Sequence, residues 1–516
     1  MNAKRMKCAL GTVVGLAAAF SGFSTWAVSP IARDVELDAI MQKAGQQYVD
    51  NFRRSRGHST QVTVRSWADL EGSLIYIDLG PGALPAQDDG SNEQLEQEVG
   101  GLLLHYAYLA GMPQHTQVRV LYQGRPYESY FPYIPGSWGP NTARVSRRAG
   151  GLAVVSSSHG QFLHHPGREW RYQRPFLNDV REDLITPAFG DALQGLIEQR
   201  SEMTVSRVRS RDLANHEESG EPWWQMAARY HLKALYPEQA EIWNSLPGST
   251  QNDREMLEDI RARPNFANFI QADGLISIHT NGNDSPAVRG VEAYYHRDKL
   301  QDRAFADSIL CYMKELIRSQ VGYEEFPFRG EARPGGHGEN GIASMPSVIV
   351  EVAYHSNPED ALALQDPVFR EASMKGVEKG YRLWREGKGC NPLKVDPIAT
   401  IRVAAGQSRV VDLGFAGFPQ YPVVIETKNV ACPPGWKCTD GAVTLPDPDS
   451  KPAQITLRCE NAGSAPIYWD TRMVDDDGVK SPPVRHIVQC VRGSGVLASP
   501  AAHADDGRVA TARRLP

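Results

Sequence analysis

The chain has 516 residues and a mass of 57.0 kDa, which is too long for one ordinary domain, so we expect several modules. Hydrophobic residues make up 41% of the chain and charged residues 22%, a composition that excludes a chain disordered throughout or crossing a membrane many times. The formal net charge is −6 and the sequence shows no clustered basic face, so nucleic acid is not an expected partner.

Residues 1–27 have the pattern of a signal peptide. Basic residues including Lys4 and Arg5 precede an apolar run, and small residues surround Trp26. Gly, Ser and Thr interrupt the run and leave it shorter than the roughly 20 residues that span a membrane. The sequence therefore predicts an exported protein, periplasmic or extracellular, with no spanning segment after cleavage.

Six cysteines remain once Cys8 has left with the signal peptide. An even number in an exported chain indicates disulfide bonds. Six cysteines allow 15 pairings, and proximity in sequence favours Cys432 with Cys438 and Cys459 with Cys490.

Residues 30–130 are expected to form a small α+β domain, because an amphipathic segment is followed by VTVRSW, SLIYIDLG, a helical stretch and VRVLYQG. This order weakly resembles GerMN-type domains of bacterial envelope proteins, since a strand ending in YIDLGPG precedes a helix and a final VRVLYQGRP strand. Pro, Gly, Ser and Tyr are frequent in residues 130–148, which favours an irregular connector.

Residues 150–388 alternate short apolar runs with long amphipathic segments. This pattern is typical of a mostly parallel sheet with helices on both faces, a three-layer α/β/α domain. The expected buried strands lie in GLAVVSSS, GLISIHTN and PSVIVEVAY, and helices are expected over 182–200, 304–317 and 368–384. The Trp- and Glu-rich segment 213–256 is an insertion that either caps the sheet or only decorates it.

Six short β runs separated by turn signals follow in residues 395–493, and they predict a β-sandwich. Residues 494–516 have little to bury and are expected to be a disordered tail. The whole chain is therefore predicted to be a multidomain α/β protein.

Two histidines follow or end predicted buried strands, and parallel strands bring such ends to one edge of a sheet. His159 follows GLAVVSSS and His279 follows GLISI. Glu182 begins the first long helix, and Glu351 ends the apolar part of PSVIVEV, where an unpaired carboxylate would be costly. Two histidines and one carboxylate leave a fourth position on zinc for water, and a further carboxylate could serve as general base.

These residues resemble the zinc-dependent N-acetylmuramoyl-L-alanine amidases of the type-3 group, over about residues 150–388. The resemblance lies in SSSHGQF, VREDL, RPNFANFIQADGLISIHTNG, VRGVEAYYH and MPSVIVEVAYHSNPEDA. It implies that His159, Glu182 and His279 hold Zn²⁺, that Glu351 is the catalytic glutamate, and that Asn281 orients substrate.

The chain departs from this family in its first motif, where Ser156–Ser158 stand in place of Asp-Pro-Gly. The loop that follows is long and carries His164 and His165, either of which could replace or supplement a ligand. Glu169 and Asp183 stay open as alternatives to Glu182, which is placed by distance and helix context.

The resemblance implies hydrolysis of the amide between N-acetylmuramic acid and L-alanine in peptidoglycan. A zinc carboxypeptidase or other exopeptidase, and a non-catalytic cell-wall-binding protein on an amidase fold, remain as alternatives. Peptidoglycan is the expected partner, and the flanking domains offer surfaces for a protein activator or another envelope partner.

Overall fold

The computed structural model describes residues 34–56, 58, 61–86, 88, 91–113, 116–132, 149–449, 452–493 and 510–514. The predicted signal peptide and nearly all of the predicted connector lie outside the described residues. Among the described residues, no helix combines the length and apolar character needed to cross a membrane.

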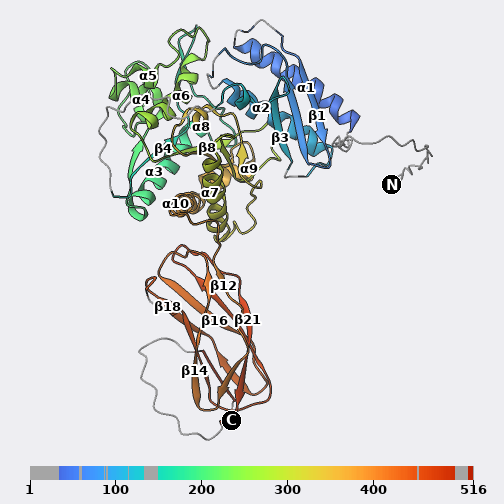
Figure 1. The fold of residues 1–516 in the computed structure, drawn as a ribbon, viewed down its shortest axis with the longest axis vertical. Coiled ribbons are helices and arrows are strands. Elements are labelled where there is room, and N and C mark those ends of the chain that lie inside the picture. The colour runs from blue at the N-terminus through green and yellow to red at the C-terminus, as the bar shows by residue number, and fades with distance from the viewer. Residues whose placement is uncertain are drawn as a thin grey trace, which may run out of the picture.

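The N-terminal unit, residues 34–132, packs two helices against a three-stranded sheet (Figure 1). Asp34 caps the first helix, because its carboxylate accepts hydrogen bonds from the amides of Glu36 and Leu37. The first two strands are antiparallel and the second and third are parallel. The elements are α1 (Val35–Ser55), β1 (Val64–Asp69), β2 (Leu74–Leu79), α2 (Ser91–Leu109), β3 (Gln117–Tyr122) and the 3₁₀ turn η1 (Tyr127–Ser129).

The central unit is built on a six-stranded sheet of order β10-β9-β11-β8-β4-β7, in which only the β9–β11 pair is antiparallel. The predominantly parallel sheet agrees with the prediction. Its strands are β4 (Leu152–Ser157), β7 (Thr204–Arg207), β8 (Gly274–Asn281), β9 (Glu292–Tyr295), β10 (Arg333–Pro334) and β11 (Ser347–Tyr354), and β5 (Phe162–His164) pairs with β6 (Glu169–Arg171) outside this sheet.

Helices cover both faces of this sheet. Along β8, Ile276 and Ile278 face the apolar core shared with α3, α7 and α10, whereas Leu275 faces the core shared with α4 and α6. The predicted insertion 213–256 supplies η2, α4 and α5, and Leu232 and Ile242 from it pack against the sheet. The helices are α3 (Glu182–Arg200), η2 (Trp223–Gln225), α4 (Ala228–Leu235), α5 (Ala240–Trp243), α6 (Arg254–Phe269), α7 (Leu300–Arg318), α8 (Gly338–Ile342), α9 (Pro358–Gln365) and α10 (Pro367–Arg385).

The C-terminal unit has a five-stranded sheet of order β13-β21-β20-β16-β18 and a four-stranded sheet of order β14-β19-β22-β17, which share one apolar core. The disulfide Cys459–Cys490 joins the two sheets, since β19 carries one cysteine and β21 the other. The strands are β12 (Lys394–Val395), β13 (Ile401–Ala404), β14 (Gln407–Asp412), β15 (Phe415–Ala416), β16 (Val423–Ala431), β17 (Trp436–Thr439), β18 (Gly441–Leu445), β19 (Gln454–Cys459), β20 (Ile467–Val474), β21 (Val484–Val491) and β22 (Ala510–Arg514).

The prediction of a disordered tail over 494–516 is wrong for residues 510–514. These residues form β22, which lies between β19 and β17 and pairs with both. A strand in this position is held by backbone hydrogen bonds to its neighbours, so it needs few apolar side chains of its own. The other residues of the predicted tail lie outside the described residues.

The central and C-terminal units are joined by covalent and ionic contacts. The disulfide Cys311–Cys390 links α7 to the segment that leads to β12, and Cys432–Cys438 closes a short loop after β16. Both disulfides predicted from sequence proximity are therefore present. The carboxylate of Asp477 accepts two hydrogen bonds of 2.7 and 2.8 Å from Arg200 on α3 and lies 3.1 Å from Lys375 on α10.

Candidate metal centre and catalytic site

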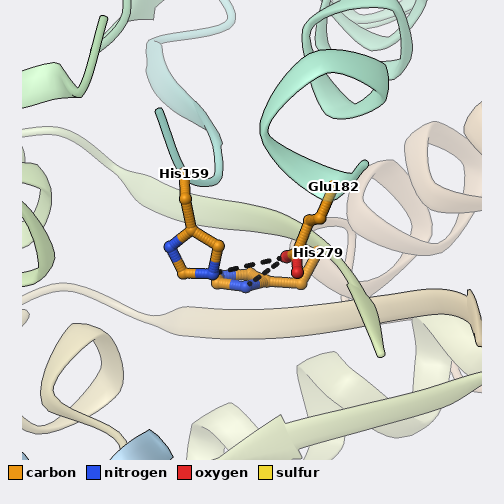
Figure 2. A group of neighbouring side chains, drawn as sticks. All are labelled: His159, Glu182 and His279. Carbon is orange, nitrogen blue, oxygen red and sulfur yellow. Dashed lines mark ion pairs between the residues drawn. The ribbon is translucent and has the colours of Figure 1, made fainter. Parts of the chain in front are cut away.

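Three adjacent central strands bring the predicted site residues to one edge of the sheet. His279 lies near the carboxyl end of β8, and Glu351 occupies the paired position on β11. His159 lies two residues beyond β4, which pairs with β8 on the other side. Glu182 is the first residue of α3 and points toward the same place (Figure 2). The open α/β sheet therefore gathers side chains that are far apart in the sequence.

His159, Glu182 and His279 form a compact buried group (Figure 2). Oε1 of Glu182 lies 3.4 Å from Nε2 of His159 and 3.1 Å from Nδ1 of His279. Two histidines and one carboxylate are the donor set of many open zinc sites. Ligand atoms placed 2.0–2.1 Å from a tetrahedral ion are about 3.3 Å apart, so the observed separations fit zinc.

Unpartnered atoms support the same conclusion. Among the described residues, Nε2 of His159 and Oε2 of Glu182 are buried without a hydrogen-bond partner. Burying polar atoms without partners is costly, and a cation bound between these side chains would satisfy them.

His279 lies between two carboxylates. Its Nδ1 faces Glu182, and its Nε2 lies 3.1 Å from Oε1 of Glu339 on α8. Burial acts to lower the pKa of His279, but the charge of Glu339 and the hydrogen bonds to both glutamates outweigh burial and raise it well above its usual value. A carboxylate on the far nitrogen orients a metal-binding imidazole and makes it more basic.

His159 is held in a neutral state. Burial, followed by the charges of Arg174 and Arg263, lowers the pKa of His159 well below its usual value. Arg263 Nη2 lies 3.1 Å from Nδ1 of His159, and since a guanidinium can only donate, this ring nitrogen accepts. The ring proton is then on Nε2, facing Glu182, and metal binding at Nε2 would displace it.

The carboxylate of Glu182 is positioned by its neighbours. The hydroxyl oxygen of Ser158 lies 2.8 Å from Oε1 of Glu182, and the amide of Thr280 donates a hydrogen bond to the same oxygen at 3.2 Å. Burial acts to raise the pKa of Glu182, but the hydrogen bond from His279 and the charge of Arg174 lower it to about 2. The third serine of the altered first motif therefore contacts the carboxylate that could bind metal.

Glu351 differs from the other carboxylates of the site. Its Oε2 is buried and has no hydrogen-bond partner among the described residues. Burial raises the pKa of Glu351 to about 8, and the nearby charge of Glu182 acts in the same direction. A carboxyl with this pKa can hold or release a proton near neutral pH, which is what general acid–base catalysis requires.

The alternative ligands lie in other environments. Nε2 of His165 is 3.3 Å from Glu255, and Glu169 is exposed and paired with Arg171. Asp183 accepts hydrogen bonds from the amides of Gly160, Gln173 and Arg174, so it fixes the loop before α3. His164 also lies outside the groups of described residues that could hold a metal ion. Asn281, at the end of β8, accepts a hydrogen bond from Gln97 of α2.

Sequence reasoning missed three residues of the site. Glu339 contacts His279, Arg263 pairs with Glu339 and Asp259, and Glu93 of α2 forms a second buried group with His279 and Glu339. Burial, followed by the charge of Glu339, raises the pKa of Glu93 to about 7. Glu93 and Glu339 lie in segments with no catalytic pattern, and only the folded chain brings them to His279.

Comparison with known proteins shows similarity between part of this chain and N-acetylmuramoyl-L-alanine amidases. Residues 178–381 match Amidase_3, described as N-acetylmuramoyl-L-alanine amidase. The chain is 29% identical over 121 residues to the N-acetylmuramoyl-L-alanine amidase LytC of Bacillus subtilis, covering 23% of each protein. It is 26% identical over 145 residues to the germination-specific N-acetylmuramoyl-L-alanine amidase of B. subtilis, covering 28% of this chain and 58% of that protein. The chain thus spans less than two thirds of these curated relatives.

Two solved structures are also similar to part of the chain. The catalytic domain of the amidase CwlV from Bacillus (Paenibacillus) polymyxa var. colistinus is 18% identical, with a TM-score of 0.30, covering 46% of this chain and 99% of that one. The amidase Ami1 from Mycobacterium smegmatis is 15% identical, with a TM-score of 0.31, covering 47% and 100%. The family match contains Glu182, His279 and Glu351 and begins after His159. Residues 178–381 of this chain are therefore similar to the type-3 N-acetylmuramoyl-L-alanine amidase family.

Proposed function

We propose that this chain is a zinc-dependent peptidoglycan hydrolase that cleaves the amide between N-acetylmuramic acid and the L-alanine of the stem peptide. The family match supports the reaction class. The observation that carries the proposal is the buried His159–Glu182–His279 group with Glu351 at the strand position paired with His279.

In this proposal, the side chains of His159, Glu182 and His279 would hold the zinc ion. Bound zinc supplies a Lewis acid that polarises a carbonyl oxygen and lowers the pKa of water. Glu339 keeps the ring of His279 oriented through its contact with Nε2.

Glu351 is the proton carrier of the proposed reaction. Its carboxylate accepts a proton from the attacking water, whose hydroxide adds to the amide carbonyl carbon, and returns the proton to the leaving amine nitrogen. The products are a carboxylic acid on the muramic acid and a free amino group on L-alanine. Asn281 orients the substrate from the end of β8.

We further propose that the protein acts outside the cytoplasm, in the periplasm or the extracellular envelope. Three disulfide bonds support an oxidising compartment. The N- and C-terminal units provide surfaces for an activating protein or another envelope partner.

Two variants of the full chain test the assigned roles on purified sacculi. Glu351→Gln is expected to retain zinc and lose release of stem peptide, whereas His279→Ala is expected to lose both. Glu169→Gln, on an exposed carboxylate, is the matched control and is expected to keep zinc and activity. Undiminished hydrolysis by Glu351→Gln would remove its assigned role.

Mass spectrometry of the digested muropeptides identifies the bond that is cut. A free N-terminal L-alanine supports the amidase. Loss of C-terminal residues from the stem peptide would instead identify an exopeptidase, and binding to sacculi without any release would identify a non-catalytic wall-binding protein.

A further inference from the structure

The N-terminal unit makes specific contacts with the edge of the sheet that carries the proposed catalytic residues. From α2, the side-chain amide of Asn92 donates to the carbonyl oxygen of Gly336 at 2.7 Å, and that of Gln97 donates to Oδ1 of Asn281 at 2.8 Å. Arg174 also donates to Oε1 of Gln97 at 3.3 Å. Figure 1 shows α2 on the side of the N-terminal unit that faces α8.

Glu93 extends farthest into the site. One carboxylate oxygen of Glu93 and ligand atoms of His279 and Glu339 all lie within 4.8 Å of one another. Oε2 of Glu93 is buried and has no hydrogen-bond partner in the described part of the chain. A helix of the N-terminal unit thus places a carboxylate against a histidine that we assign to the metal.

This arrangement closes the site to a large substrate. His159 is 0% exposed, His279 2% and Glu351 5%. The cavity beside Glu351 has a volume of about 230 Å³ and is walled partly by α2 and β3. Ligand pockets usually measure roughly 300–1,000 Å³, so a glycan strand with its peptide does not fit here.

Contacts farther from the site hold the same closed position. Arg56 of the N-terminal unit lies 3.0 Å from Asp253, and Arg329 donates to the hydroxyl of Tyr108 at 2.9 Å. Val288 and Tyr354 of the central unit are buried against the apolar core of the N-terminal unit. Domain contacts with many polar groups resemble transient interfaces, so such a unit can separate without unfolding.

We propose that the N-terminal unit is an autoinhibitory cap, with Glu93 as the group that closes the catalytic site and Asn92 and Gln97 as its latch. Substrate enters only when α2 leaves Asn281 and Gly336. The inhibited reaction rests on the proposed function, whereas access to the site can be measured without any reaction.

A disulfide between the units tests the closed state. A Cβ built on Gly101 of α2 would lie 2.9 Å from Cγ of Asn283 and 3.3 Å from its Oδ1, the farthest of the three nearest atoms. The Cβ of Asn283 is not one of these three atoms, so it lies at least 3.3 Å from the Cβ built on Gly101. Because it is bonded to Cγ, the distance between the two Cβ atoms is at most about 4.4 Å. A Cβ–Cβ distance in this range suits a disulfide.

The oxidised Gly101→Cys/Asn283→Cys double variant is expected to lose peptide release from sacculi and to give up zinc to a chelator more slowly than wild type. Reduction should restore both rates to those of the Asn283→Cys single variant. Wild type in the same reductant controls for the native disulfides. An oxidised double variant that hydrolyses sacculi and loses zinc as fast as its reduced form overturns the proposal.

Two matched pairs of substitutions test the open state. Glu93→Ala/Gln97→Ala removes the closing group and half of the latch, whereas Glu36→Ala/Gln47→Ala removes the same residue types from exposed positions on α1. The first pair is expected to raise zinc loss and peptide release by roughly tenfold. The second should leave both unchanged, and equal rates for the two pairs contradict a cap.

Amide hydrogen exchange separates this proposal from the proposed function. Residues 333–339 are expected to exchange faster in Glu93→Ala/Gln97→Ala than in wild type, with or without metal. If exchange rises and no variant releases stem peptide, the result supports the autoinhibitory cap and contradicts the proposed amidase function. Unchanged exchange in this variant overturns the cap.

Discussion

Glu351 and His279 occupy paired positions on the neighbouring parallel strands β11 and β8. Paired residues on parallel strands point to the same face of a sheet, so the backbone register alone sets the carboxyl beside the imidazole. On the other side of β8, His159 follows β4, and Glu182 enters from the first turn of α3.

Replacing Ser158 should weaken metal binding. The hydroxyl of Ser158 contacts the carboxylate of Glu182, and loss of such an outer contact typically lowers metal affinity 10- to 100-fold. Competition with a chromophoric chelator would measure this loss in Ser158→Ala. Ser156→Ala is the control, since the buried hydroxyl of Ser156 has no hydrogen-bond partner among the residues that the structure describes. Equal affinities for the two variants would rule out a positioning role for Ser158.

Glu339→Gln should also lower metal affinity roughly 10- to 100-fold. The neutral amide of the variant lacks the negative charge that Glu339 places beside the imidazole of His279. Stability should also fall by about 3 kcal/mol, the low end for breaking a buried ion pair, since Asp259 still pairs with Arg263. Metal titration well below the unfolding temperature separates the two effects.

The control for Glu339 is Asp302→Asn, which breaks the buried pair between Asp302 and Lys299, whose charged atoms are 2.9 Å apart. This variant should lose stability and keep its metal affinity. If Glu339→Gln also loses stability but keeps its metal affinity, then Glu339 has only a structural role.

The metal-free protein should lose stability as the pH rises, in part because of Glu351. The carboxyl of Glu351 ionises near 4.5 in the unfolded chain and at about 8 in the folded one, so the folded state binds more protons in between. Its contribution to stability is complete below pH 4.5 and is lost as the pH rises to 8, by roughly 1.4 kcal/mol for each pKa unit.

Glu351→Gln should remove this loss of stability at high pH. Urea unfolding of the metal-free protein should show that the variant is no less stable than wild type at pH 5 and clearly more stable at pH 8.5. Glu241→Gln, on an exposed carboxylate of α5, should follow the wild type at both values. A constant difference between Glu351→Gln and wild type across this range would show that Glu351 ionises normally.

Asp477→Ala should destabilise the contact between the central and C-terminal units. The substitution leaves Arg200 and Lys375 without their shared carboxylate, at an expected cost of about 2–4 kcal/mol. Calorimetry should show a lower unfolding temperature. Asp476→Ala, on the exposed neighbour, should unfold like wild type, and the same behaviour from Asp477→Ala would mean that the ion pairs add nothing.

The central sheet could be predicted from the sequence because its strand signals are local, whereas the proposal of His159, Glu182 and His279 as metal ligands also needed the resemblance to the type-3 amidases. The runs that end in His159, His279 and Glu351 are short, apolar and bounded by polar residues, which is how buried parallel strands appear. Both short-range disulfides were also predictable, since the paired cysteines are only 6 and 31 residues apart.

The features that the sequence did not predict depend on contacts between segments that are distant in the chain. Glu93 lies in an acidic stretch that looks like an ordinary solvated helix start, and it meets His279 only because the N-terminal unit docks on the sheet edge. Glu339 sits between glycines with no local pattern. Residues 510–514 carry no strand signal, because their pairing is set by free backbone groups on β17 and β19.

The disulfide Cys311–Cys390 determines how tension would travel through the molecule. It fastens the chain just after α10 to the middle of α7, one of the helices packed on the central sheet. A pull on the C-terminal sheets would therefore be carried into α7 by a covalent link, and the last turn of α10 would not unwind first.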